Sequence, residues 1–300
     1  MRQLLLAMLG LTGCGRILFD PNPAALDGGG GDTTDASPCT LGPWTMPRLQ
    51  AATSSTSTEF SPALSSDGLT LYFESDKVGG AGGYDLYVAT RATITDDFGP
   101  PINSGAVNSA GDDRAPTLTT DGLTLYLQRG TGSPNGRLYR AGRVNIADPF
   151  DAPTIVPELA STDVEGPAIS PRGDELFFSQ GSDMYRATFD GATFSGVAPM
   201  TELNTGPSQG YASVGGDGVE LYFETTRGDG AFDDVWIARR PAIGAAFVTA
   251  SREDALSSSG ASDSDPEVSR DGRTALIASD RPGGLVAGEF DLYLSTRACQ

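Results

Sequence analysis

Residues 61–91 read SPALSSDGLTLYFESDKVGGAGGYDLYVATR. An extended stretch runs into Asp67-Gly68, a dipeptide typical of tight turns between strands. The apolar run LTLYF follows the turn, and a glycine-rich segment leads into a further run, YDLYV. Short apolar runs bounded by Gly, Asp and Ser favour strands over helices. The stretch therefore predicts three consecutive strands.

The same pattern occurs five times in the chain. The counterparts of Asp67 in the turn are Asp121, Arg172, Asp217 and Asp271. Five residues before each of these stand Pro62, Pro116, Pro167, Ala212 and Pro266, and five residues after each stand Tyr72, Tyr126, Phe177, Tyr222 and Leu276. Offsets that hold at five places identify an internal repeat of 45 to 54 residues.

A fourth element completes each repeat. An aromatic residue lies 22–24 residues before each turn, at Trp44, Phe98, Phe150, Phe194 and Phe247. In the first three copies a proline follows, which suits an edge strand. Five units of four strands predict an all-β, five-bladed β-propeller. Because the chain begins with an edge strand, the N-terminal strand must complete the last blade and close the ring. The alternative of six blades would need one more repeat.

The repeat resembles the PD40 (WD40-like) propeller repeat, the type found in the propeller of the periplasmic protein TolB. The resemblance covers residues 44–297 and rests on the stretch SPALSSDGLTLYFESDKVGGAGGYDLYVAT and its four counterparts. The copy at Arg172 departs from the pattern by lacking the turn aspartate, and the last copy has Leu276-Ile277 in place of aromatics. Nothing in the chain resembles the separate α/β domain of TolB, so TolB's partners are not implied.

Composition excludes several classes of function. The formal net charge of −19 argues against nucleic acid as a partner. The chain has no histidine and a single lysine, Lys77, which excludes Ser-His-Asp and Cys-His catalysis. The glycines of residues 79–83 match no nucleotide-binding fingerprint. The closely spaced carboxylates of residues 262–267 could hold Ca²⁺, which stays an alternative, but they lack the EF-hand pattern. We therefore expect no cofactor and no metal.

The N-terminus predicts export and lipidation. Residues 1–13 combine Arg2 with a short apolar segment, as in a secretory signal. The sequence Leu-Thr-Gly-Cys ending at Cys14 resembles the lipobox of bacterial lipoproteins, which implies cleavage before Cys14 and its lipidation. Residues 14–38, rich in Gly, Pro and Asp, predict a flexible tether, and residues 39–300 form the propeller. We expect a monomer in the bacterial cell envelope, held by its lipid at the outer membrane, facing the periplasm or the cell surface.

Two cysteines remain after lipidation of Cys14. Cys39 ends the tether and Cys299 precedes the last residue. In an exported protein such a pair favours a disulfide, and a closed ring would bring both ends of the chain together. Two free thiols are the alternative.

In a propeller the hairpin after the second strand and the crossover between blades lie on one face, and the Asp-Gly turns lie on the other. The variable residues belong to the first face, which is the predicted ligand face. Its candidate residues are Glu59, Lys77, Asp113, Arg114, Arg129, Glu165, Arg227, Asp265 and Arg281. The alternative is that these side chains are solvated loop tips without a ligand.

Three functions fit these observations. The main expectation is a non-catalytic, lipid-anchored module that binds an envelope protein or glycan, and so no enzyme. A second is a glycoside hydrolase that works with carboxylates, chemistry that needs no histidine. A catalytic pair of this kind should break the repeat at the channel. A third is a purely structural envelope component.

Overall fold

The computed structural model describes residues 40–130, 135–206, 208–228 and 231–300. The chain divides into two units, residues 1–39 and residues 40–300, and every described residue belongs to the second. The predicted signal, tether, Cys14 and Cys39 all lie outside the described residues.

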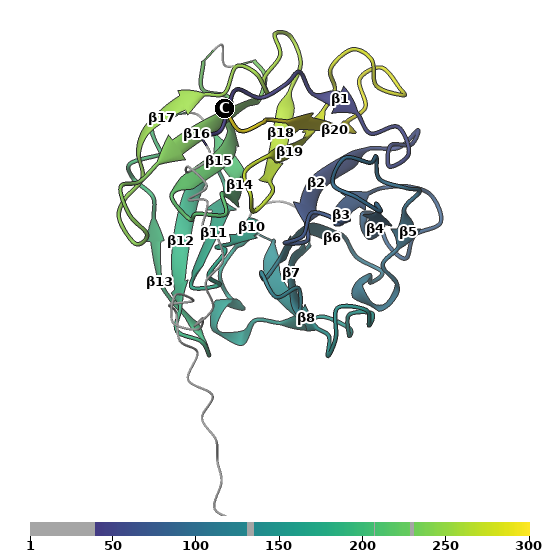
Figure 1. Cartoon of the computed structure of the whole chain (residues 1–300). Helices are drawn as coiled ribbons and strands as arrows, with labels where there is room; N and C mark the ends of the chain where they lie inside the picture. Colours follow the sequence, from purple (N-terminus) through teal and green to yellow (C-terminus); the bar gives the residue numbers. More distant parts are fainter. Residues whose placement is uncertain (1–39, 131–134, 207, 229–230) are drawn as a thin grey trace, which may run out of the picture. The chain divides into compact units, whose positions relative to one another are not determined.

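The second unit is a ring of five antiparallel four-stranded sheets (Figure 1), which confirms the predicted all-β five-bladed propeller and excludes six blades. Blade 1 contains β2 (Glu59–Leu64), β3 (Thr70–Ser75), β4 (Asp85–Thr90) and β5 (Ile102–Asn103). Blade 2 contains β6 (Asp113–Leu118), β7 (Thr124–Arg129), β8 (Arg137–Gly142) and β9 (Thr154–Ile155). Blade 3 contains β10 (Glu165–Ile169), β11 (Glu175–Gln180), β12 (Asp183–Phe189) and β13 (Phe194–Pro199). Blade 4 contains β14 (Gln209–Val214), β15 (Glu220–Thr225), β16 (Asp234–Arg239) and β17 (Val248–Arg252).

Blade 5 joins the two ends of the unit. It contains β18 (Asp263–Val268), β19 (Thr274–Ser279) and β20 (Asp291–Thr296), and its outer strand is β1 (Arg48–Leu49). Figure 1 shows β1 beside β20, and Arg48 pairs with Leu294 in the register. The ring is therefore closed by the N-terminal strand, as predicted. Two short 3₁₀ helices, η1 (Gly105–Val107) and η2 (Pro157–Leu159), lie in crossovers between blades.

The hydrophobic core lies between neighbouring blades, in five clusters. Leu71 and Phe73 of β3, for example, pack in one cluster with Leu276 and Leu292 of blade 5. Because each blade is covered on both faces, its middle strands are buried along almost their whole length. This accounts for runs such as LTLYF, in which apolar residues are consecutive instead of strictly alternating.

The Asp-Gly turns, with Arg172-Gly173 as their counterpart in blade 3, join the first two strands of each blade. Gly68 and its four counterparts have φ between +66° and +74°, a left-handed conformation that glycine adopts without a Cβ clash. The Asp67 carboxylate accepts a hydrogen bond from the Leu69 N–H at 3.0 Å, and Asp121, Asp217 and Asp271 do the same in their own turns. These aspartates stabilise turns, as their sequence context predicts.

Candidate functional site

The innermost strand of each blade contains a β-bulge at the same position of the repeat. The bulge residues have φ between +41° and +54° and are Ser61, Ala115, Gly166, Tyr211 and Asp265. A non-glycine residue in this region is strained by about 1–2 kcal/mol, so other contacts must hold it there. The five bulges form a ring around the central channel, which we call the bulge ring.

Side chains from the preceding blade, all at one position of the repeat, hold three of the five bulges. The Ala115 N–H donates to Glu74 Oε2 at 2.6 Å, the Gly166 N–H to Gln128 Oε1 at 3.1 Å, and the Asp265 N–H to Glu224 Oε2 at 3.1 Å. Glu74, Gln128 and Glu224 occupy the same repeat position, seven residues after the turn aspartate. The hydrogen bonds therefore link one blade to the next at the channel.

The other two junctions are built differently. Between blades 3 and 4, Ser179 stands at the position of Glu74, and its buried hydroxyl group makes no hydrogen bond within the described part of the chain. Blade 5 has Ala278 at the position of Glu74, so it offers no acceptor to blade 1. Asp265, itself a bulge residue, instead accepts from the Ser61 N–H at 2.9 Å and from the Ser61 hydroxyl at 3.2 Å. The repeat is broken here, and the break places an additional carboxylate in the channel.

Five charged or polar side chains meet on the hairpin side of the bulge ring and at the ring itself. We call this group, Glu74, Arg114, Tyr211, Glu224 and Asp265, the acid cluster. Arg114 forms an ion pair with Glu74 at 2.8 Å, and its guanidinium lies 4.1 Å from the centre of the Tyr84 ring. Glu74 and Asp265 are buried, whereas Arg114, Tyr211 and Glu224 keep partial contact with solvent.

Burial and mutual repulsion set the protonation of these carboxyls. Burial, reinforced by the Glu74 carboxylate, raises the pKa of Asp265 to about 7. Burial and the Asp265 carboxylate raise the pKa of Glu224 well above its usual range. Burial likewise raises the pKa of the Tyr211 phenol. The two carboxyls repel each other when both ionise, so loss of a proton from one makes the other hold its proton more tightly.

The structure divides the sequence-predicted ligand face. It brings Arg114 and Asp265 into the acid cluster, and Glu165 lies one residue before the bulge of blade 3. Burial and the nearby Asp163 raise the pKa of Glu165, while Arg114 acts in the opposite direction. Lys77 is exposed.

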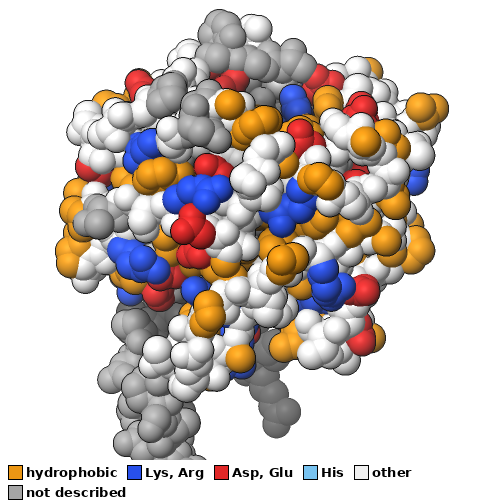
Figure 2. Space-filling model, turned by 90° about the horizontal axis from the view of Figure 1, so that it is seen from above, with side chains coloured by type: hydrophobic (Ala, Val, Ile, Leu, Met, Phe, Trp, Pro, Cys, Tyr) orange, Lys and Arg blue, Asp and Glu red, His pale blue; other side chains and the backbone are white. Residues whose placement is uncertain are grey.

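The other candidates of that face stabilise the blades. Arg129, Arg227 and Arg281 lie 4.5–5.1 Å from the rings of Tyr139, Trp236 and Tyr293 and donate to the crossover carbonyls of Val107, Leu203 and Leu256. Asp113 pairs with Arg129 at 2.7 Å, and Arg281 pairs in the same way with Asp263. Glu59 accepts from Ser55 and Ser75. Figure 2 shows basic side chains interspersed with acidic ones on the side seen there.

Three residues of the acid cluster, Glu74, Tyr211 and Glu224, were not predicted from the sequence as site residues. Glu74 and Glu224 lie within middle strands, where the sequence pattern gives no reason to distinguish a polar residue from the rest of the repeated hairpin. Tyr211 stands where other copies have Ser, Ala, Gly or Asp. Comparing the five copies column by column would have shown that charge varies at these positions.

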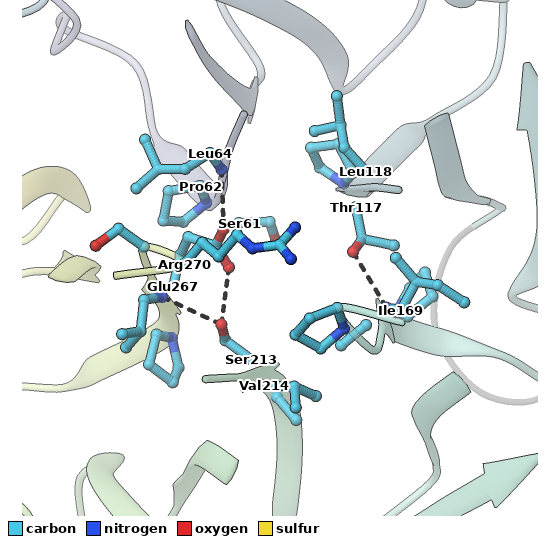
Figure 3. A pocket seen from close by; sticks show the side chains of 18 of the residues that line it. Ser61, Pro62, Leu64, Thr117, Leu118, Ile169, Ser213, Val214, Glu267 and Arg270 are labelled. Atoms are coloured by element: carbon cyan, nitrogen blue, oxygen red, sulfur yellow. Dashed lines mark hydrogen bonds between the residues drawn. The ribbon is translucent and has the colours of Figure 1, made fainter. Parts of the chain in front are cut away.

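A cavity of about 90 Å³ occupies the other half of the channel, between the bulge ring and the Asp-Gly turns. All five bulge residues contribute to its lining, and Ser65, Thr119 and Ser269, which lead into the turns, also contribute. Figure 3 shows interblade contacts in its wall. Glu267 accepts from the Leu64 N–H at 2.9 Å and from the Ser213 hydroxyl at 2.8 Å, and Thr117 accepts from the Ile169 N–H at 3.2 Å. The channel therefore has two distinct halves.

Among the described residues, no His, Cys, Asp and Glu side chains form a group of three that could hold a metal ion. Within the same residues, no helix is long and apolar enough to cross a membrane.

No family model and no curated protein matches the chain. Several solved structures match the chain in fold. The catalytic domain of the GH62 α-L-arabinofuranosidase of Coprinopsis cinerea matches with a TM-score of 0.61 at 13% identity, over 86% of this chain and 98% of that one. Xylan β-1,4-xylosidase of Bacillus halodurans matches with a TM-score of 0.54 at 13% identity, over 83% of this chain. TolB of Acinetobacter baumannii matches with a TM-score of 0.50 at 15% identity, over 78% of this chain. The chain spans 54% of the length of each of the last two.

These structures correct the main functional expectation. The sequence was interpreted as a non-catalytic binding module and no enzyme. That interpretation is wrong, because propellers that match more than four fifths of the chain are glycoside hydrolases. At these identities the likeness establishes the fold, and the activity of this chain is a separate question.

Proposed function

We propose that this chain is a glycoside hydrolase whose reaction takes place at the acid cluster. The observation that carries the proposal is the break in the repeat, which puts Asp265 beside Glu224 at the centre of the ring. Glycosidases need two carboxyl groups held in different protonation states. Solved propellers of similar fold include an α-L-arabinofuranosidase and a xylosidase, which supports the proposal.

The environments of the two carboxyls assign their roles. Glu224, which keeps its proton and some contact with solvent, is the general acid that protonates the leaving oxygen. Asp265 ionises first and is the second carboxylate, acting as base or nucleophile. Glu74 and Arg114 are positioning residues, because their ion pair and the hydrogen bond to Ala115 fix the bulge of blade 2.

The full chain should hydrolyse a substrate in a panel of 4-nitrophenyl glycosides, beginning with the α-L-arabinofuranoside and the β-D-xyloside named by the neighbouring enzymes. Replacing Glu224→Gln should lower kcat/KM at least about 10³-fold with the fold intact. Glu202→Gln makes the same substitution at an exposed position outside the channel and should leave turnover unchanged. No turnover on any glycoside or polysaccharide, or equal turnover by both variants, would overturn the proposal.

We propose further that the enzyme is a PD40-repeat protein, exported and lipid-anchored through Cys14 in the bacterial envelope, with a glycan of that compartment as substrate. The lipobox-like sequence before Cys14 and the tether of residues 14–38 support the anchor. Intact-mass measurement of the membrane-extracted protein should show loss of residues 1–13 and a gain of acyl mass. An unprocessed chain would contradict the anchor without affecting the hydrolase proposal.

We also propose a Cys39–Cys299 disulfide. Leu41 forms a β-bridge with Cys299, and the Gln300 N–H donates to the Thr40 carbonyl at 2.9 Å, so the two residues that follow Cys39 pair with Cys299 and Gln300. In the chain-entropy model, closing so long a loop stabilises the fold by roughly 5 kcal/mol as an upper value. Peptide mapping without reduction should recover the two cysteines in one linked fragment, whereas two alkylated thiols would disprove the bridge.

A further inference from the structure

The cavity on the turn side of the bulge ring is lined by different kinds of residue along its walls and at its opening. Its walls are formed by the same position of all five inner strands, which is aliphatic in every blade: Leu64, Leu118, Ile169, Val214 and Val268. Four prolines and Ala212 line it next to the bulge ring. A volume of about 90 Å³ is several times what one water needs. The cavity can therefore hold a small organic group, which would contact these aliphatic residues as well as polar atoms of the lining.

The opening of the cavity is polar, and most of its hydroxyl groups are already engaged. Ser65, Thr119 and Ser269 donate to the aspartates of their own turns, and Thr120 donates to the Pro171 carbonyl at 2.6 Å. Because these hydroxyl groups already donate their hydrogen bonds within the protein, another group must supply the main polar contact for a ligand.

Arg270 is that group. It is the one Lys or Arg among the described residues that line the cavity, and it is exposed. Figure 3 shows its guanidinium extended over the middle of the pocket. It makes no hydrogen bond or ion pair with any residue in the described part of the chain, whereas Arg114, Arg129 and Arg240 are all paired with acids.

The backbone of Arg270 is held in place by the turn of blade 4. A Cβ atom on Gly216 would lie 1.7 Å from the Arg270 carbonyl oxygen, so the turn of blade 4 packs directly against it. A second groove of about 180 Å³ shares Pro171, Gly216 and Arg270 with the cavity and adds the exposed Arg172. Arg172 stands where four of the five copies have the turn aspartate. Two exposed arginines, Arg172 and Arg270, therefore lie at this side of the opening, together with Asp174 and Asp217 of the same groove.

We propose that this turn-side cavity binds a small organic anion, with its carboxylate on Arg270 and its apolar body between the aliphatic walls. A guanidinium pairs strongly with a carboxylate through two parallel N–H···O bonds. The two acids that line the cavity, Asp265 and Glu267, are held against other blades and accept hydrogen bonds there. The site is separate from the acid cluster's solvent-exposed side and does not depend on the hydrolase proposal.

The test uses the full chain with benzoate as the probe, benzyl alcohol as its neutral counterpart and inorganic phosphate as an anion without an apolar body. Calorimetric titration at pH 6 should show saturable benzoate binding at least about tenfold tighter than binding of either comparison compound. Methyl resonances of Leu64, Leu118 and Val214 should shift on titration, which places the ligand in the cavity.

Two variants separate a built site from general charge attraction. Arg270→Gln should weaken benzoate binding at least about tenfold. Arg140→Gln removes the same charge from an exposed position on β8 and should leave binding unchanged. The proposal would be overturned if both variants lost benzoate binding equally, if phosphate bound as tightly as benzoate, or if benzoate showed no saturable binding. Each of these outcomes counts whatever the result of the glycosidase assays.

Discussion

Glu74 of blade 1 accepts a hydrogen bond from the backbone N–H of Ala115 in blade 2 at 2.6 Å, while its other oxygen pairs with Arg114. One buried side chain thus joins two blades, holds a strained bulge and neutralises a cation. Contacts of this kind determine both the stability of the ring and the chemistry of its centre.

Replacing Glu74→Ala should therefore destabilise the fold by about 3 kcal/mol, since it leaves Arg114 without its partner and the Ala115 N–H without an acceptor. Gln128→Ala removes the equivalent neutral acceptor of Gly166 in the next blade and should cost only about 1–2 kcal/mol. Urea denaturation of both variants measures the difference. Equal losses would show that the ion pair adds nothing to the interblade link.

Stability should fall as the pH rises towards neutrality, and Glu267 should be one cause. Burial raises the pKa of Glu267 from 4.5 to about 7, so the folded state binds its proton more tightly than the unfolded state does. The stabilisation is complete below pH 4.5 and is lost as the pH rises through about 7. Because the side chain is not completely buried, we expect a change of roughly 2 kcal/mol.

Glu267→Gln tests this dependence directly. An amide resembles the protonated carboxyl and can still accept from the Leu64 N–H, so the variant should lose part of the pH dependence between pH 5 and 8. Glu202→Gln, on the surface, should keep the slope of the parent protein. Thermal unfolding across this range provides the comparison, and parallel curves for all three proteins would refute the assignment.

The pH dependence of turnover follows from the acid cluster. Activity requires Asp265 ionised and Glu224 protonated, so kcat/KM should rise as the pH passes about 7 and fall at higher pH, when Glu224 loses its proton. The two apparent values belong to the interacting pair. Asp265→Asn should remove the rising limb together with most of the activity. A rate that declines steadily from pH 5 would be incompatible with these roles.

A buried ion pair links blades 3 and 4 beneath their turns. Arg240 and Glu175 are 2.5 Å apart, and the Arg240 side chain is fully buried. Arg240 also donates to the Gly218 carbonyl and covers the Phe247 ring. Arg240→Met should cost about 3–5 kcal/mol because Glu175 remains buried without its partner, and the double variant with Glu175→Leu should recover much of the loss. Differential scanning calorimetry of the single and double variants checks the coupling.

Much of the fold could be predicted because the repeat has strong local signals. Asp67-Gly68 fixes a turn, and the prolines after Phe98 and Phe150 mark edge strands. The equivalent aromatics also have a partner that sequence did not reveal: Arg91, Arg143 and Arg240 stack on Phe98, Phe150 and Phe247 and donate to the carbonyl of the turn glycine. The positions of the strands can be predicted from the sequence of each repeat, whereas the contacts between repeats cannot.

The site was harder to predict for a physical reason. In the sequence, Arg129 and Arg281 resemble ligand-binding cations in hairpins. In the structure, each forms an ion pair with an acid and stacks on an aromatic ring of its own blade. Glu224 looks like an ordinary strand residue, but the ring directs it towards the bulge of the next blade. Which polar groups face the channel depends on how blades pack around the axis, and no single repeat contains that information.

The closure of blade 5 by β1 makes the propeller topologically a circle that happens to be cut between residues 300 and 40. The cut could be placed elsewhere. Joining residue 300 to residue 40 by a short linker and opening the chain at the exposed Gly191–Ala192 turn between β12 and β13 would give the same ring with blade 3 as the composite blade. Such a circular permutant would move the N-terminus, and with it any tether, to a different side of the ring without altering the residues of the channel.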